Sequence, residues 1–296
     1  MVKSLLINDS PLRAVYAHEH ITIDLSGHKN DDDCRLDDPN LAFIGLSSMK
    51  NAGVETVLDQ TARGMGRNPL YTQSVCDKAN INVVHATGFY KVPFLPDECC
   101  TLEEADMAKL FLSEINEGMD TTGIKAGFIG EIGTGHNQIH PMEEKIFRAA
   151  AIAHCESGAP ICTHATLGTM GEEQIKLLAG YGVDLSHVVL SHIDLSGDLQ
   201  YMLRLLDTGV NIAFDTIGKN NYQLDEHRIM WLNKLCEKGF AGQIVLSMDL
   251  TRKSSCRELG YDYLMVKFIP KLMQTGFSES WLEALLYTNP RRIYRI

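Results

Sequence analysis

The segment covering residues 15–25 places two histidines, His18 and His20, on either side of Glu19 within an otherwise apolar run. In a β-strand, residues two apart point to the same face, so the two imidazoles would point together and Glu19 would point away. Two neighbouring imidazoles can bind one metal ion, but they can equally be ordinary polar residues at the end of a strand. Glu19, pointing outward, is expected to serve the structure rather than the chemistry.

Further metal-competent side chains close other apolar runs in the same way. A single histidine or aspartate that ends a strand is usually just a hydrogen-bonding residue. Six of them are harder to explain in that way, because each interrupts a run that otherwise calls for valine, isoleucine or leucine, and burying them unpaired is costly. The additional residues are Glu131 in GFIGEIGTG, His164 in ICTHAT, His192 in VVLSHID and Asp249 in VLSMDLT.

The set of four imidazoles and two carboxylates predicts the class of metal. Imidazole with carboxylate suits Zn²⁺, with Mn²⁺, Co²⁺ and Fe²⁺ as alternatives, better than Ca²⁺ or Mg²⁺. Six protein ligands are too many for one tetrahedral catalytic ion. They fit two ions about 3.5–4 Å apart, bridged by a carboxylate and a hydroxide.

The elements that must position these residues are eight apolar, strand-like runs separated by helix-like stretches. Successive runs mostly begin 22–35 residues apart, and this alternation predicts a parallel sheet closed into a (β/α)8 TIM barrel. In such barrels the chemistry lies at the C-terminal ends of the strands, where all six residues fall. The runs cover residues 15–25, 54–61, 81–88, 124–133, 159–166, 187–194, 210–218 and 243–251.

The chain lacks any linker-like or low-complexity tract, so residues 1–296 are expected to form a single domain. The alternative architecture is a doubly wound open sheet. That fold usually carries a glycine-rich phosphate loop after its first strand, whereas here the first run continues as IDLSGHKN.

Among the helices, residues 101–118 are expected to begin with a capping box formed by Thr101 and Glu104, and residues 142–158 to end at Gly158.

Composition limits the partners. The net charge of −11 lacks the basic footprint that a nucleic-acid backbone requires, so a small-molecule substrate is expected instead. No apolar run approaches the roughly 20 residues of a membrane span, and the N-terminal apolar block is too short for a secretory signal. The eight cysteines show no CxxC spacing, which is typical of reduced thiols and predicts a cytoplasmic location.

Taken in order, the motifs HEHI, GEIGT, THA, SHID and SMD resemble the phosphotriesterase family of the amidohydrolase superfamily, in particular its phosphotriesterase-homology (phosphotriesterase-related) branch. The similarity covers nearly the whole chain and includes MGRN, ATGFY and the tail from GYDYLMVKFIPKL to NPRRIY. The resemblance implies a binuclear centre. By position, His18, His20 and Asp249 would hold the more buried ion, and His164 and His192 the more exposed one.

Two departures from the family pattern are informative. Many members use a carbamylated lysine at the end of the fourth strand, but here that position is Gly130, followed by Glu131. The resemblance therefore implies that Glu131 bridges the ions directly, and no carbamylated lysine is expected; Lys125 lies too far toward the other end of the strand. Thr216 stands where classical phosphotriesterases carry a proton-relaying histidine, so efficient triester hydrolysis is not expected.

The expected reaction is attack of the bridging hydroxide on a carboxylic ester, lactone, amide or phosphoester. Asp249 would accept the proton and pass it to the leaving group. Tyr90, Arg63, Arg252 and Thr216 follow strand-like runs and are expected to contact the substrate. Several cationic side chains in an acidic protein favour an anionic substrate.

Two other readings remain open from the sequence. A TatD-type metal-dependent DNase uses a similar set of histidines, glutamate and aspartate, although the net charge of −11 disfavours DNA. A barrel that binds a metal or metabolite without turnover is the second reading, and the complete set of ligands and proton acceptor argues against it. Asp194 and Asp215 are expected to orient ligands or loop backbone. A homodimer is the family-level expectation.

Overall fold

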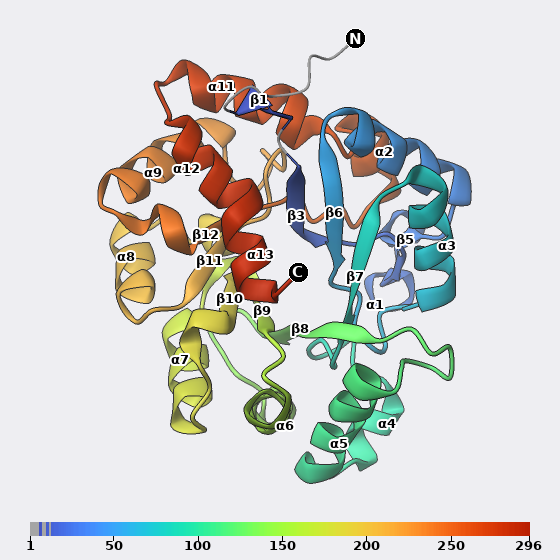
Figure 1. Ribbon diagram of the computed structural model, residues 1–296. Coiled ribbons are helices and arrows are strands. Elements are labelled where there is room, and N and C mark those ends of the chain that lie inside the picture. Colours follow the sequence, from blue (N-terminus) through green and yellow to red (C-terminus); the bar gives the residue numbers. More distant parts are fainter. Residues whose placement is uncertain (1–5, 8–9, 12) are drawn as a thin grey trace.

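Eight parallel strands form a ring at the centre of the computed structural model, which describes residues 6–7, 10–11 and 13–296 (Figure 1). Neighbours in the ring follow chain order, and the backbone N–H of Asp249, beyond the last strand, donates to the carbonyl of His18 on the first at 3.2 Å. The predicted (β/α)8 barrel is therefore confirmed. The strands are β3 (Ala14–Glu19), β6 (Val54–Asp59), β7 (Asn82–Thr87), β8 (Ala126–Thr134), β9 (Ile161–Ala165), β10 (Val188–Ser191), β11 (Asn211–Phe214) and β12 (Ile244–Leu246).

Helices surround the ring and bury the outer faces of the strands (Figure 1). Two short antiparallel pairs accompany them, β1 (Leu6–Ile7) with β2 (Ser10–Pro11) and β4 (Ile23–Asp24) with β5 (Arg35–Leu36). None of the helices in the described part of the chain is both long and apolar enough to cross a membrane. The helices are α1 (Ser26–Lys29), α2 (Pro39–Asn51), α3 (Pro69–Ala79), α4 (Asp97–Thr101), α5 (Glu104–Asn116), α6 (Pro141–Ser157), α7 (Gly171–Gly180), α8 (Leu199–Asp207), α9 (Asp225–Glu237), α10 (Lys253–Glu258), α11 (Ile269–Gln274), α12 (Glu279–Glu283) and α13 (Asn289–Tyr294).

The capping box predicted for Thr101 and Glu104 is wrong. Thr101 ends α4, where its hydroxyl donates to the carbonyl of Glu98 at 2.9 Å, and α5 begins at Glu104 without a side-chain cap. The chain between the two helices is extended, so one predicted helix is two. The predicted end of α6 is confirmed, because Gly158 adopts a φ of +71° there.

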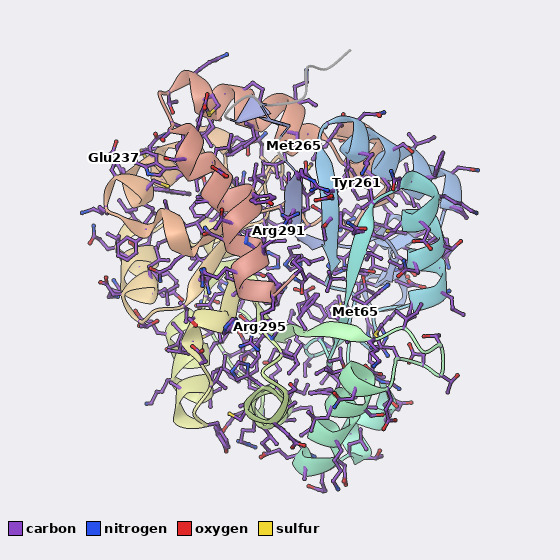
Figure 2. The ribbon with its side chains drawn as sticks, viewed as in Figure 1. Met65, Glu237, Tyr261, Met265, Arg291 and Arg295 are labelled. Carbon is purple, nitrogen blue, oxygen red and sulfur yellow. The ribbon has the colours of Figure 1, made fainter. Side chains whose placement is uncertain are left out.

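The N-terminal end of the barrel is closed by α13. Tyr294 and Ile293 belong to the same buried cluster as inward-facing residues of all eight strands, and the Tyr294 ring lies 5.3 Å from that of Phe128. Arg291, labelled on α13 in Figure 2, pairs with Glu55 at the start of β6 at 2.8 Å. With this end closed by packing, the C-terminal ends of the strands are free to carry a site.

Candidate metal centre

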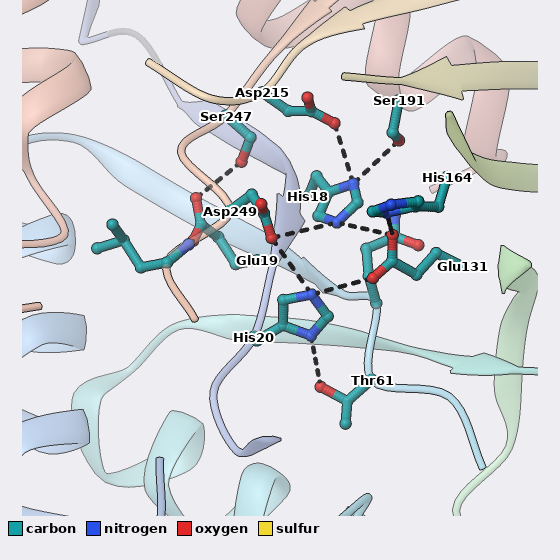
Figure 3. Close-up of polar contacts among 12 residues, drawn as sticks. His18, Glu19, His20, Thr61, Glu131, His164, Ser191, Asp215, Ser247 and Asp249 are labelled. Atoms are coloured by element: carbon teal, nitrogen blue, oxygen red, sulfur yellow. Dashed lines mark hydrogen bonds and ion pairs between the residues drawn. The ribbon is translucent and has the colours of Figure 1, made fainter. Parts of the chain in front are cut away.

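Four side chains from three parts of the ring face one point at its C-terminal end (Figure 3). The Nε2 atoms of His18 and His20 lie 3.6 and 3.4 Å from Oδ1 of Asp249. The same two nitrogens lie 3.6 and 3.4 Å from the two oxygens of Glu131. The four residues predicted from separate motifs are thus brought together.

A second group shares Glu131 with the first. Oε2 of Glu131 lies 3.0 Å from Nδ1 of His164 and 3.7 Å from Nε2 of His192. The two ring nitrogens are themselves 2.9 Å apart. Glu131 stands between the two groups, with Oε1 facing His20 and Oε2 facing His18, His164 and His192.

These atoms fit a divalent metal. The Nε2 atoms of His18 and His20 are buried and have no hydrogen-bond partner among the described residues. A buried polar atom without a partner is costly, and a cation at their common focus would remove that cost. Ligand atoms bound at about 2.0–2.2 Å in a tetrahedron lie about 3.3–3.6 Å apart. This range matches the 3.4–3.6 Å that separate the Nε2 atoms of His18 and His20 from the oxygens of Asp249 and Glu131.

The outer nitrogens of the histidines are held by other side chains. Nδ1 of His18 lies 3.0 Å from both the Ser191 hydroxyl and Oδ2 of Asp215, whose Oδ1 lies 2.9 Å from Nδ1 of His192. Nδ1 of His20 lies 2.9 Å from the Thr61 hydroxyl. With the ring proton on Nδ1 in these contacts, the Nε2 lone pairs would face the focus, as metal-binding histidines require.

The electrostatics keep both carboxylates ionised. Burial by itself raises the pKa of Glu131, but the neighbouring His164 and His18 hold that pKa well below its usual range. For Asp249, burial again opposes ionisation, and the Lys219 ammonium 2.5 Å from Oδ2 holds the pKa far below normal. Burial lowers the pKa of His164 to about 4. For His18, His20 and His192 burial acts in the same direction, but the carboxylates around them outweigh it and raise each pKa, and a bound cation would displace the protons that these imidazoles hold.

The backbone at the ligands departs from regular strand geometry. His192 and Asp249 have positive φ angles of 64° and 50°, which are strained for residues other than glycine. The register shifts between Tyr16 and Glu19 in β3, and such shifts next to active sites redirect side chains. His18 and His20 nevertheless share one face, with ring centroids 5.5 Å apart.

Glu19 points away from the two histidines, but into the protein rather than toward solvent. Its Oε1 accepts a hydrogen bond from the Ser247 hydroxyl at 2.8 Å (Figure 3). Oε1 also accepts from the Met248 N–H at 2.9 Å, and Oε2 accepts from the Leu250 N–H at 3.3 Å. The two amides flank Asp249. Glu19 therefore fixes the loop that presents Asp249.

The six candidate ligands, His18, His20, Glu131, His164, His192 and Asp249, form the metal cluster. A cavity of about 330 Å³ opens above it. Tyr90 lines it, and its hydroxyl lies 3.2 Å from Nδ1 of His164. Thr216 also lines it, but the Thr216 hydroxyl donates to Asp194 at 2.5 Å and accepts from the fully buried Arg228 at 2.6 Å. Both residues expected to contact substrate from these positions thus border the cavity.

Arg63 and Arg252 are not brought to the cavity. Arg63 pairs with Glu98 at 2.8 Å and with Glu114 at 2.6 Å, below the loop that follows β6. Arg252 pairs with Asp31 at 2.6 Å. Because carboxylates from other segments already satisfy both guanidinium groups, neither is retained as a substrate contact.

Three lysines lining the cavity stand out instead. Lys219 follows β11, and its contact with Asp249 could not be anticipated because 30 residues separate the two. Lys29 and Lys91 were missed altogether. Both lysines follow strand-like runs directly, in SGHKN and GFYKV, and this position in the sequence could have identified them as cavity residues.

Comparison with known proteins agrees with this geometry. A sequence model of the phosphotriesterase family matches residues 2–294. The chain is 43% identical to the phosphotriesterase homology protein of Escherichia coli K12, over 96% of this chain and 99% of the relative. The crystal structure of that protein, complexed with phosphate in its active site, gives a TM-score of 0.93 over the same shares of the two chains.

Two further relatives are named for their activities. The N-acetyltaurine hydrolase of Dictyostelium discoideum is 30% identical, over 91% of this chain and 76% of the relative. The structure of a lactonase from Listeria monocytogenes gives a TM-score of 0.91 at 29% identity, covering 96% of this chain and 94% of that one. From the family match, the relatives and the shared fold, we conclude that the chain belongs to the phosphotriesterase family of hydrolases.

Proposed function

We propose that the protein is a binuclear metal-dependent hydrolase that cleaves a carboxylic ester, lactone, amide or phosphoester of a small anionic molecule. The observation that carries this proposal is the position of Glu131. One of its oxygens faces His20, and the other faces His18, His164 and His192 at 3.0–3.7 Å. A carboxylate between two groups of imidazoles is the arrangement that a bridged pair of ions needs.

In this proposal His18, His20 and Asp249 would hold one ion, His164 and His192 would hold the other, and Glu131 would bind both. Zinc suits these ligands, and Mn²⁺, Co²⁺ or Fe²⁺ would also fit. The bound ions would supply Lewis acidity and make hydroxide available near neutral pH. With Glu131 as the bridge, the site would assemble without a modified lysine. Lys125 is exposed and lies just before β8.

Asp249 is the proton carrier in the proposed reaction. Its Oδ1 faces His18 and His20, while Oδ2 accepts from Lys219 at 2.5 Å. Asp249 would take the proton of the attacking water and deliver it to the leaving group. Thr216 cannot take the place of the relay histidine, because its single hydroxyl proton is donated to Asp194.

The relatives suggest which bonds to test first. N-acetyltaurine is an amide and a lactone is a cyclic ester, so the reactions of both relatives involve attack at a carbonyl carbon. We therefore propose a carboxylic ester or amide bond, in a molecule that also carries a negative charge, ahead of a phosphoester.

The test is a screen of N-acyl amino acids, lactones and phosphoesters against metal-reconstituted protein. Wild type and the control variant Lys125→Gln should hydrolyse the same members of the panel, whereas Glu131→Gln should hydrolyse none. Activity in Glu131→Gln together with its loss in Lys125→Gln would contradict the assignment of the bridge. Binding of metal without hydrolysis of any compound would support a non-catalytic barrel, and steady 3′ trimming of single-stranded DNA with Mg²⁺ would support the DNase reading.

A further inference from the structure

We propose that Lys29 and Lys91 form an anion-binding subsite at the cavity, which recognises a carboxylate or other oxyanion on the substrate away from the bond that is cleaved. The inference rests on the proposed function, because the metal cluster is where that bond would lie. Both lysines line the same cavity as Glu131 and His164, so one small molecule can reach the cluster and the subsite together.

The stem of Lys91 is held next to a proposed metal ligand by a glycine. Lys91 follows Tyr90 at the end of the β7 segment, and it lies against Gly133 of β8. A Cβ atom built on Gly133 would lie 3.1 Å from Cδ of Lys91 and 3.0 Å from Cβ of His164. Gly133 therefore leaves the space that lets the lysine stem run alongside His164.

Aromatic rings then position the two ammonium groups. Nζ of Lys91 lies 5.5 Å from the ring centroid of Tyr90 and 5.4 Å from that of Phe94. Nζ of Lys29, at the end of α1, lies 5.9 Å from the same Phe94 ring. Cation–π contacts of this kind attract an ammonium group without neutralising its charge. Two like charges from different loops are thus gathered around one ring.

Neither ammonium group has a carboxylate within 4.0 Å among residues 13–296. The hydrogen bond of Lys91 is to the Val92 carbonyl at 3.4 Å. The neighbouring Glu143 accepts hydrogen bonds from the N–H groups of Val92, Gly135 and His140 instead. By contrast, Lys219 in the same cavity is paired with Asp249.

The absence of a carboxylate partner for Lys29 and Lys91 is informative because acidic residues outnumber basic ones in this chain, which has a net charge of −11. Burial lowers the pKa of Lys91, nearby carboxylates partly oppose this, and the charge of Lys29 lowers it further. A bound anion would offset both the burial and the repulsion. The remaining lining is largely apolar, including Leu25, Leu167 and Leu195, so the substrate would carry its anion on an uncharged body.

The test uses calorimetry of the metal-loaded protein with two probes, N-acetyl-β-alanine and its neutral carboxamide. A charge-assisted hydrogen bond is worth about 1.5–3 kcal/mol, so Lys91→Met should raise the Kd of the anion about 10-fold or more, and Lys29→Met should raise it less. The Kd of the carboxamide should stay the same in every variant. Lys176→Met, which removes an exposed lysine on α7, is the matched control and should bind both probes as wild type does.

Several results would overturn the subsite. One is wild-type protein that does not prefer the anion, and another is a Lys91→Met variant that keeps the wild-type preference. A third is a Lys91→Met variant whose affinity for both probes falls to the same extent, which would indicate structural damage. Failure of the proposed function has a different signature, since absence of hydrolysis across the substrate panel leaves the calorimetric difference between the probes unaffected. Where the panel provides an anionic substrate, Lys91→Met should raise its KM and leave kcat near the wild-type value.

Discussion

In the proposed reaction, metal binding and proton transfer meet at Asp249. Its two oxygens have different neighbours, with His18 and His20 on one side and Lys219 on the other. Asparagine keeps one oxygen for the metal but cannot accept the proton. Asp249→Asn should therefore lose about 100-fold or more in kcat, the usual contribution of a general acid–base, while it retains most of its bound metal. Turnover and metal content are measured on the same preparation, and near wild-type turnover would rule out this role.

At the same scale, the sequence was sufficient to predict which six metal-competent side chains lie together, but not which cationic side chains line the cavity. The six clustered residues could be predicted because each interrupts an apolar run at the end of a strand. Arg63 and Arg252 could not be assigned in this way, because their partners Asp120 and Asp31 lie 57 and 221 residues away in the chain. Whether a cationic side chain is free or paired depends on such contacts between distant segments.

At the scale of elements, the last helix should stabilise the barrel without taking part in the chemistry. Tyr294 on α13 is buried against Phe128 at the end opposite the metal cluster. Truncating a buried aromatic side chain costs about 3–5 kcal/mol, so Tyr294→Ala should unfold at a clearly lower temperature while keeping its metal content at 25 °C. Thermal unfolding followed by circular dichroism measures the difference. Tyr294→Phe keeps the ring and is the control, and an equal loss in both variants would contradict the packing role of the ring.

The strands were more predictable than the helix ends. All eight strands appear within or beside the expected runs, because a strand buried on both faces leaves a continuous apolar signature. The sequence analysis missed the break between α4 and α5. The two residues between these helices are Leu102 and Glu103, and neither is a glycine or proline, the residue types that usually mark such a break. The pairing of β4 with β5 was also missed, because two-residue strands have no periodicity to detect.

For the molecule as a whole, His154 should make stability depend on pH. Its Nδ1 donates to the Ala159 carbonyl at 2.8 Å, and its Nε2 accepts from the Asp184 N–H at 3.2 Å, so the fold binds the neutral imidazole. Burial lowers the pKa of His154 in the folded protein, whereas the unfolded chain has the ordinary pKa of about 6.5. The unfolded state thus binds more protons between these values, and stability falls as the pH drops through about 6.5.

The measurement is the shift in thermal midpoint between pH 7.5 and 5.5, made on metal-free protein so that metal binding does not contribute. His154→Gln should lose less stability over this range than wild type. His227→Gln, which removes an exposed histidine on α9, should behave as wild type does. An equal acid shift in His154→Gln and wild type would exclude His154 as the source.

The whole-molecule architecture followed from the sequence because eight repeats of strand and helix allow few other closed arrangements. The lining of the cavity could not be predicted from the sequence, because its walls come from segments that follow several different strands. Lys29, Lys91 and Lys219 belong to three such loops, and only the closed ring brings them together.

The central claim, that Glu131 joins two ions in one site, is tested most directly by the ratio of zinc to protein. Wild-type protein and Glu131→Gln are reconstituted with zinc, dialysed, and assayed by inductively coupled plasma mass spectrometry. Wild type should retain two zinc ions per chain and Glu131→Gln fewer than two, because the bridging carboxylate would bind both ions. One zinc ion per wild-type chain, or two in both proteins, would contradict it.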